Sequence, residues 1–94
     1  MKHPGNTTLF RNEKGYVNRD DNNSSYHIGF GIVEFELVYH DFIAFVTGLR
    51  NIKKQKSSED ALYTVQIPFP GVKLKLTSRE LDDLLLIVNK ASEQ

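Results

Sequence analysis

Apolar and polar residues alternate along residues 65–69 and again along residues 72–76, and a different spacing follows at residues 81–88. Alternation is typical of strands with one buried face, whereas apolar residues at i, i+3, i+4 and i+7 share one face of a helix. Between the alternating stretches, Pro70–Gly71 suits a type II turn, because proline restricts φ and glycine accepts a positive φ. The pattern therefore predicts a β-hairpin followed by a helix.

The same order of patterns occurs earlier, because residues 26–49 align with residues 65–88 without a gap. In this earlier copy the "GFG" of residues 29–31 takes the turn position, with glycine freedom in place of proline stiffness. We interpret the match as an internal duplication of a ββα unit. The coinciding apolar pairs are Ile28/Ile67, Phe30/Phe69, Val33/Val72, Phe35/Leu74, Leu37/Leu76, Phe42/Leu81, Phe45/Leu84, Val46/Leu85 and Leu49/Val88.

The two predicted helices differ in how they begin. Thr77 and Glu80 have the spacing of a capping box, in which each side chain bonds the backbone N–H of the other residue. In the first copy Val38 takes the position of Thr77 and cannot cap, and Gly48 lies inside the helix, where glycine costs up to about 1 kcal/mol. We expect the second helix to be the more robust.

These elements predict an α+β fold: a duplicated ββα–ββα unit with one antiparallel sheet, two helices on one face of it, and a short N-terminal hairpin. A chain of 94 residues suits a single domain with one modest core. Its expected parts are an N-terminal hairpin at residues 7–18, a first unit at 26–52, a linker at 53–62 and a second unit at 63–91.

The return strands of the two units, residues 33–37 and 72–76, carry opposite charges on their polar side. If they form the central antiparallel pair, acidic and basic side chains meet across it and help to set the register. The outer strands would then be edges, one of them covered by the N-terminal hairpin. The facing side chains would be Glu34 and Glu36 on one strand and Lys73 and Lys75 on the other.

The open face of this sheet is expected to be polar, because the phenylalanines of both units fall on the core side. Sheets that bind single-stranded nucleic acid instead expose aromatic residues on which bases stack. The pattern therefore predicts a solvated surface. Its predicted residues are His27, Glu34, Glu36, Thr64, Gln66, Lys73 and Lys75.

Composition narrows the class of protein. The apolar share of 39% and the charged share of 26% are typical of soluble domains, and no apolar run approaches the roughly 20 residues that span a bilayer. The chain has no cysteine, so it has no disulfide, thiolate metal site or cysteine nucleophile. Its N-terminal residues lack the apolar segment of a secretory signal, so we expect a cytoplasmic protein. The alternative is a mature secreted chain without cysteine.

The charge balance argues against a general nucleic-acid binder, because twelve basic and twelve acidic residues cancel. One dense basic patch stands out, formed by Arg50, Lys53, Lys54 and Lys56. It can be the solvated end of a helix and its linker, where cations also suit the helix dipole. It can also be a phosphate-binding patch, and the sequence leaves both interpretations open.

Catalytic and metal-binding patterns were sought and not found. The loop expected at residues 18–25 is rich in Asp and Asn, but it lacks the turn glycine and the twelfth-position Glu of a calcium loop. Turn-forming side chains explain this composition better. His3, His27 and His40 have no partner at a zinc-motif spacing, and no nucleophile elbow or phosphate loop is present. We expect no enzyme and no cofactor.

The stretches "YHIGFGIVEFELVYHDFIAFV" and "GVKLKLTSRELDDLLLIVNKA" resemble a family of small uncharacterised bacterial proteins, a domain of unknown function. The resemblance covers residues 9–91 and rests on the hairpin, the "FG" turn and the two helix starts. Many members carry a cysteine pair where this chain has residues 20–25, so the resemblance implies no metal site here. It implies no activity either.

Taken together, these observations predict a non-enzymatic binding or protein-interaction module. Its partner would be another protein or a second copy of the chain. The alternative is a small nucleic-acid-associated regulatory protein that uses the basic segment at residues 50–56. No catalytic, cofactor-binding or metal-binding residue is predicted, and whether the loop at residues 18–25 holds an ion is left open.

Overall fold

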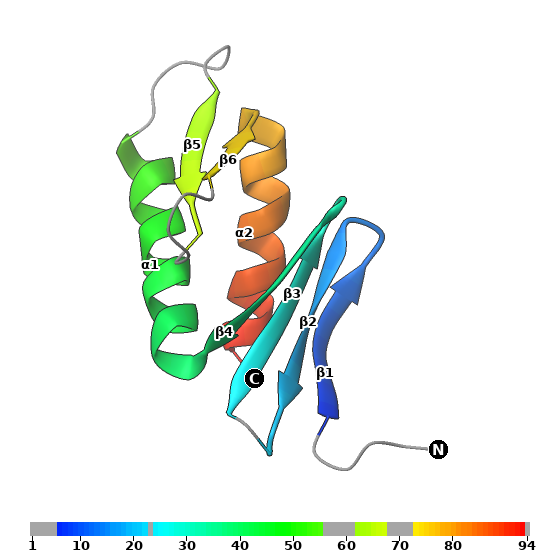
Figure 1. Ribbon diagram of the computed structural model, residues 1–94. Helices are drawn as coiled ribbons and strands as arrows, with labels where there is room; N and C mark the ends of the chain where they lie inside the picture. Colours follow the sequence, from blue (N-terminus) through cyan, green and yellow to red (C-terminus); the bar gives the residue numbers. More distant parts are fainter. Residues whose placement is uncertain (1–5, 23, 56–61, 68–72, 94) are drawn as a thin grey trace.

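The computed structural model describes residues 6–22, 24–55, 62–67 and 73–93. Within these residues the fold is α+β, as predicted, and each of two strand pairs is followed by a helix (Figure 1). The elements are β1 (Asn6–Asn12), β2 (Gly15–Asp20), β3 (Ser25–Phe30), β4 (Val33–Val38), α1 (Tyr39–Gln55), β5 (Tyr63–Gln66), β6 (Lys73–Leu76) and α2 (Ser78–Ser92).

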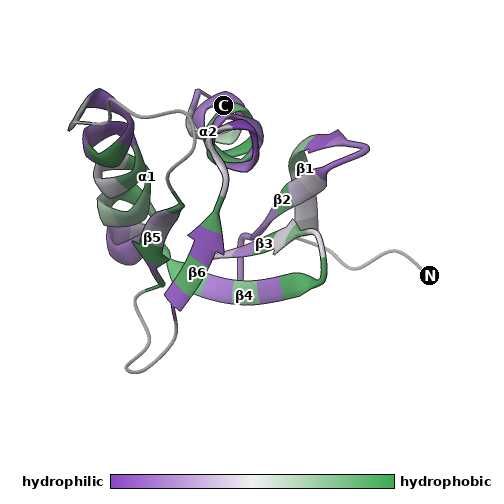
Figure 2. Cartoon of the chain, turned by 90° about the horizontal axis from the view of Figure 1, so that it is seen from above, coloured by the Kyte–Doolittle hydropathy of each residue, from purple (hydrophilic) through white to green (hydrophobic). Residues whose placement is uncertain are grey.

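The first four strands form one antiparallel sheet in the order β1-β2-β3-β4, and β5 pairs with β6 in a separate two-stranded sheet. The N-terminal hairpin is therefore part of the main sheet, because β2 pairs along the whole of β3. This confirms that the hairpin covers an outer strand. Both helices lie on the same side of the four-stranded sheet, with α2 between α1 and the β1–β2 hairpin (Figure 2).

The prediction that residues 33–37 and 72–76 form the central pair of strands is wrong. In the described residues β4 ends the four-stranded sheet and β6 pairs only with β5, so residues 33–37 and 73–76 are not neighbours. Helix packing joins the two sheets instead, since α2 contacts β1 and β2 on one side and β6 on another. Helices bury the apolar sides of both sheets. Backbone pairing between the two sheets is therefore not needed to remove these apolar sides from water.

The turns and linker also differ from expectation. The β3–β4 turn is Gly31–Ile32, and Gly31 has a φ of 63°, which a two-residue hairpin turn requires of its first residue. The loop expected at residues 18–25 is shorter, because β2 continues to Asp20 and β3 begins at Ser25. Helix α1 extends to Gln55, so the linker begins later than predicted. The predicted turn at 70–71 lies outside the described residues.

The core was largely predicted from the apolar pattern. Phe42 on α1 and Leu84 on α2 are buried, and the ring of Tyr26 on β3 stacks on Phe42 with centroids 4.3 Å apart. Helix α2 buries more of its surface than the predicted stripe, since Ile87 and Ala91 are buried as well. This wider face follows from its position, because α2 packs against α1 and both sheets.

The predicted difference between the helix starts is partly confirmed. Thr77 is the N-cap of α2: its Oγ1 accepts from the N–H of Glu80 at 3.1 Å, and Glu80 Oε1 accepts from the N–H of Thr77 at 2.8 Å. Val38 ends β4 directly before α1 and offers no such bond. No helix in the described part of the chain is long and apolar enough to cross a membrane.

Candidate functional site

The open face of the four-stranded sheet carries two side-chain pairs, Tyr16 with Glu34 and His27 with Glu36. Strand register places Tyr16, Gly29 and Glu34 side by side across β2, β3 and β4. One step along, His27 lies next to Glu36 on the same face. These side chains point to solvent because their neighbours along each strand are in the core.

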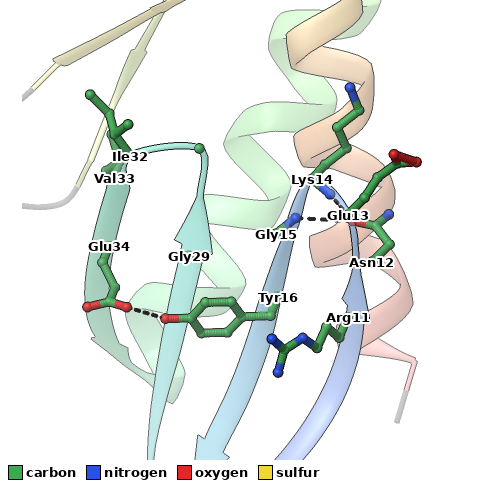
Figure 3. Close-up of a pocket in the computed structure, with 11 residues that line it drawn as sticks. Arg11, Asn12, Glu13, Lys14, Gly15, Tyr16, Gly29, Ile32, Val33 and Glu34 are labelled. Carbon is green, nitrogen blue, oxygen red and sulfur yellow. Dashed lines mark hydrogen bonds between the residues drawn. The ribbon is translucent and has the colours of Figure 1, made fainter.

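Tyr16 and Glu34 are joined across the strand that separates them. The Tyr16 hydroxyl donates a hydrogen bond to Glu34 Oε2, and the ring lies over Gly29 (Figure 3). A Cβ at Gly29 would overlap the edge of this ring, so the close contact requires glycine. Residues 29–31 were predicted to form a turn, whereas Gly29 lies within β3 and leaves room for the ring of Tyr16.

The contact changes the acidity of Tyr16. Its hydrogen bond to Glu34 raises the pKa of the Tyr16 phenol above the ordinary value of 10.0, and desolvation and the negative charge of Glu34 act in the same direction. Arg11 on β1 lowers the pKa slightly. The phenol therefore stays protonated and acts as a donor, which fixes the position of the Glu34 side chain.

Beside this pair, a hollow of about 430 Å³ lies between the β1–β2 turn and the β3–β4 turn (Figure 3). Asn12 shapes the first turn, because its Oδ1 accepts from the N–H groups of Lys14 at 2.8 Å and Gly15 at 3.1 Å. Ile32, at the tip of the second turn, is fully exposed. The hollow is open and mostly polar, and its lining combines Arg11 and Lys14 with the carboxylates of Glu13 and Glu34.

His27 and Glu36 form the second pair on this face, with Nε2 and Oε1 3.4 Å apart. Both side chains are about half exposed. His40 is exposed in the first turn of α1, away from this pair, and His3 lies outside the described residues. Among the described residues no three His, Asp or Glu side chains gather as a metal site.

The outer edge of β4 is the other distinctive feature of this sheet. Phe30 and Val33 flank a two-residue turn, and residues in that position exchange hydrogen bonds with each other. Alternation then places the backbone N–H and C=O groups of Glu34 and Glu36, and the N–H of Val38, on the side away from β3. In the described part of the chain, no backbone hydrogen bond links these groups to another strand.

The opposite edge of the sheet is built differently. In β1 the register shifts between Thr8 and Phe10, which marks a β-bulge. A bulge disrupts the ladder and discourages a further strand from pairing at that edge. Strand β4 has no register shift along its pairing with β3 and contains no proline, so its edge is the more receptive of the two.

The predicted basic patch is spread along the end of α1, and much of it contacts α2. Arg50 Nε donates to Asn89 Oδ1 at 2.8 Å, and Lys53 Nζ lies 2.6 Å from Asp82 Oδ1. The hydrogen bond to Asp82 raises the pKa of Lys53. Lys54 is exposed in the last turn of α1, and Lys56 lies outside the described residues.

The Asp- and Asn-rich segment forms a turn between β2 and β3. Asp20 Oδ1 accepts from the N–H of Asn22 at 3.0 Å, which is the side-chain-to-backbone bond of an Asx turn. Arg19 Nε lies 2.5 Å from Asp21 Oδ1. The interpretation of this segment as a turn of Asx residues is confirmed for its described residues.

Tyr16 is the open-face residue that the sequence analysis missed. Phe30, Phe35, Phe42 and Phe45 were predicted on the core side; Phe35, Phe42 and Phe45 are buried, and Phe30 is partly buried against the core. Tyr16 was not assigned to a face because the N-terminal hairpin was expected to cover an outer strand, but neither that strand nor the register was predicted. The sequence feature that could have indicated the position of Tyr16 is the neighbouring Val17. Because side chains alternate along a strand, a buried Val17 requires Tyr16 to point to the opposite face.

This chain matches no family model, no curated protein and no solved structure. The family resemblance described above therefore stays a prediction, and the function is argued from the geometry alone.

Proposed function

We propose that this protein is a non-enzymatic interaction module of the cytoplasm, which binds an extended segment of a partner protein along the free edge of β4. The observation that carries the proposal is the row of outward backbone groups formed by the N–H and C=O of Glu34 and Glu36 and the N–H of Val38, which have no strand partner in the described part of the chain. A strand added at such an edge gains main-chain hydrogen bonds, and side chains along the edge select the partner.

The side chains along β4 favour a basic partner strand. Glu34 and Glu36 project from the open face at alternate positions, and both are exposed. Opposite charges across neighbouring strands stabilise the pair, and like charges destabilise it. Tyr16 holds Glu34 in place through its hydrogen bond, so this carboxylate is already oriented before a partner arrives.

The predicted duplication supports this assignment of charges. The pairs β3–β4 and β5–β6 are each followed by a helix, and Arg50 of α1 contacts Asn89 of α2, a residue 39 positions later that occupies the same place in the second copy. In a duplicated chain, β4 and β6 descend from the same strand. The two strands then diverged in charge, so that β4 has an acidic edge and β6 has a basic one.

The basic segment of α1 is a weaker candidate for a binding surface. Arg50 and Lys53 are engaged with α2, and the carboxylate of Asp82 offsets the charge of Lys53. We therefore place the nucleic-acid-associated alternative second.

Photo-crosslinking in living cells tests the β4 edge. A photoreactive amino acid at position 38, where Val38 is exposed, should form adducts with a protein partner, and the same probe at position 8 on β1 should not. Glu36→Pro removes an outward N–H without breaking a bond to β3, because proline is tolerated on an edge strand in this orientation. It should abolish the adducts of the position-38 probe.

Glu36→Gln is the matched control, since it keeps the backbone donor and removes only the charge. It should weaken the adducts without abolishing them. Equal crosslinking from positions 8 and 38, or adducts that survive Glu36→Pro in a folded protein, would contradict the proposal.

A further inference from the structure

The same chain contains a strand, β6, with the basic side chains expected of a strand that binds at β4. Strand β6 carries Lys73 and Lys75 at alternate positions, and both side chains are exposed. In the described residues β6 pairs with β5 along one side only. It is therefore a second free edge, and its charge is opposite to that of β4.

We propose that the strand bound at β4 is β6 of a second copy of this chain. An antiparallel pairing with Phe35 opposite Leu74 of the second copy brings Glu34 against Lys75 and Glu36 against Lys73. The same register places Leu74, which is half-buried, on the side of the sheet where Phe35 meets the core. Charge and apolar character agree on both faces of the pair.

Other pairings of the two edges are less favourable. Two β4 strands related by a two-fold axis would place glutamates against glutamates, and two β6 strands would place lysines against lysines. Within one chain the pairing does not form: a hollow of about 200 Å³ separates the start of β4, at Val33, from Leu74 and Lys75 of β6. The complementary edges are thus left for another molecule.

Each copy has one acidic and one basic edge, so two copies can exchange strands reciprocally. Two such contacts close a two-fold dimer and leave neither edge of the pair free. This inference rests on the proposed function, since it names the partner strand, and it is tested on the purified chain.

Sedimentation velocity over a wide range of protein concentration should show a monomer–dimer equilibrium that weakens as salt rises. Two double variants reverse one edge each. Glu34→Lys/Glu36→Lys makes both edges basic, and Lys73→Glu/Lys75→Glu makes both edges acidic. Each variant alone should dimerise at least ten-fold more weakly than the native chain. An equimolar mixture should recover dimers of native affinity, because both contacts are complementary again.

A control variant distinguishes dimerisation through paired strand edges from dimerisation through attraction between net charges. Glu13→Lys/Glu93→Lys has the same net charge as the first variant, but both changes lie outside β4 and β6, in the β1–β2 turn and directly after α2. This control should still dimerise by itself. Mixing this control with the acidic variant should raise its dimer affinity by no more than the same mixing raises the dimer affinity of the native chain.

The outcomes distinguish the two proposals. A native chain that stays monomeric at every concentration overturns self-association, and crosslinks from position 38 to a different protein would then still support the β4 edge as a binding site. Native dimers that persist in both reversed variants also overturn this inference, because the interface would lie elsewhere. Crosslinks absent at position 38, together with monomers at every concentration, overturn both proposals, because no strand would then bind at β4.

Discussion

The hydroxyl of Tyr16 on β2 donates a hydrogen bond to Glu34 on β4, and the ring spans the strand between them (Figure 3). This contact links three strands on the open face in a way that backbone pairing alone does not. It also places an oriented carboxylate at the free edge of the sheet.

Glu34→Gln should lower the pKa of the Tyr16 phenol toward its ordinary value of 10.0, because the variant removes the negative charge and replaces the carboxylate acceptor by a weaker amide oxygen. Titration of labelled tyrosine followed by NMR measures the change for each ring separately. Glu36→Gln is the control, since Glu36 pairs with His27, and it should leave Tyr16 nearly unchanged. An unaltered Tyr16 titration in Glu34→Gln would show that the contact is absent in solution.

The same pKa shift predicts how stability depends on pH. Because the folded-state pKa of Tyr16 is raised, its contribution to stability is fully present below pH 10.0, the unfolded value, and is lost as pH rises through the folded value. Chemical denaturation above pH 10 should therefore show a loss of stability in the native chain. Tyr16→Phe should reduce this loss.

Two glycines should respond differently to the same substitution. In Gly29→Ala the new methyl meets the ring of Tyr16, which is at the surface and can move, so the free energy of unfolding should change by less than about 1 kcal/mol. In Gly15→Ala the methyl meets the backbone carbonyl of Gly29, which cannot move without distorting β3. That variant should lose about 1–3 kcal/mol. Equal losses in urea denaturation would contradict this account.

Thr77→Ala should destabilise the protein by about 0.5–2 kcal/mol, because it removes the side-chain acceptor of the capping box at the start of α2. Thr77→Ser keeps the hydroxyl and should be close to the native chain. Val38→Thr should be neutral or stabilising, since Val38 immediately precedes α1 and is exposed. Thermal melts that shift in the opposite senses would mean that the helix starts are wrongly placed.

Leu84→Ala should lose about 2–5 kcal/mol in chemical denaturation, because Leu84 is fully buried between α2 and its neighbours and truncation leaves a cavity. Leu86→Ala is the matched control on the same helix. Its side chain is 45% exposed, so the loss should be much smaller. A loss below about 1 kcal/mol for Leu84→Ala would refute the assignment of the core face.

The alternative function is tested by binding to nucleic acid. Arg50 and Lys53 contact α2, so we expect no salt-dependent binding of the native chain to DNA or RNA, even at low salt. Electrophoretic mobility shift with mixed-sequence duplexes and single strands measures this. Binding that weakens with salt and is lost in Lys54→Glu would favour the nucleic-acid-associated alternative.

Features that depend on neighbours in sequence were predictable. The order of strand, turn, strand and helix follows from a change of apolar period, and the capping box follows from the spacing of Thr77 and Glu80. The polar face followed in the same way, since alternation along β4 separates exposed Glu34 and Glu36 from buried Phe35. Each of these signals is carried by residues within one turn or one hairpin.

The β-sheet order was decided by the tertiary structure. The edges of β4 and β6 have complementary charges, and on that basis the sequence predicted that they pair, but exposed charge pairs are weak. Short connections favour the β1–β2–β3–β4 meander, and the packing of α2 against β1, β2 and β6 joins the second sheet to the first. The contact of Tyr16 with Glu34 follows from that order. The local pattern therefore determined which face of each element is buried, whereas the competition among long-range apolar contacts determined which edges stayed free.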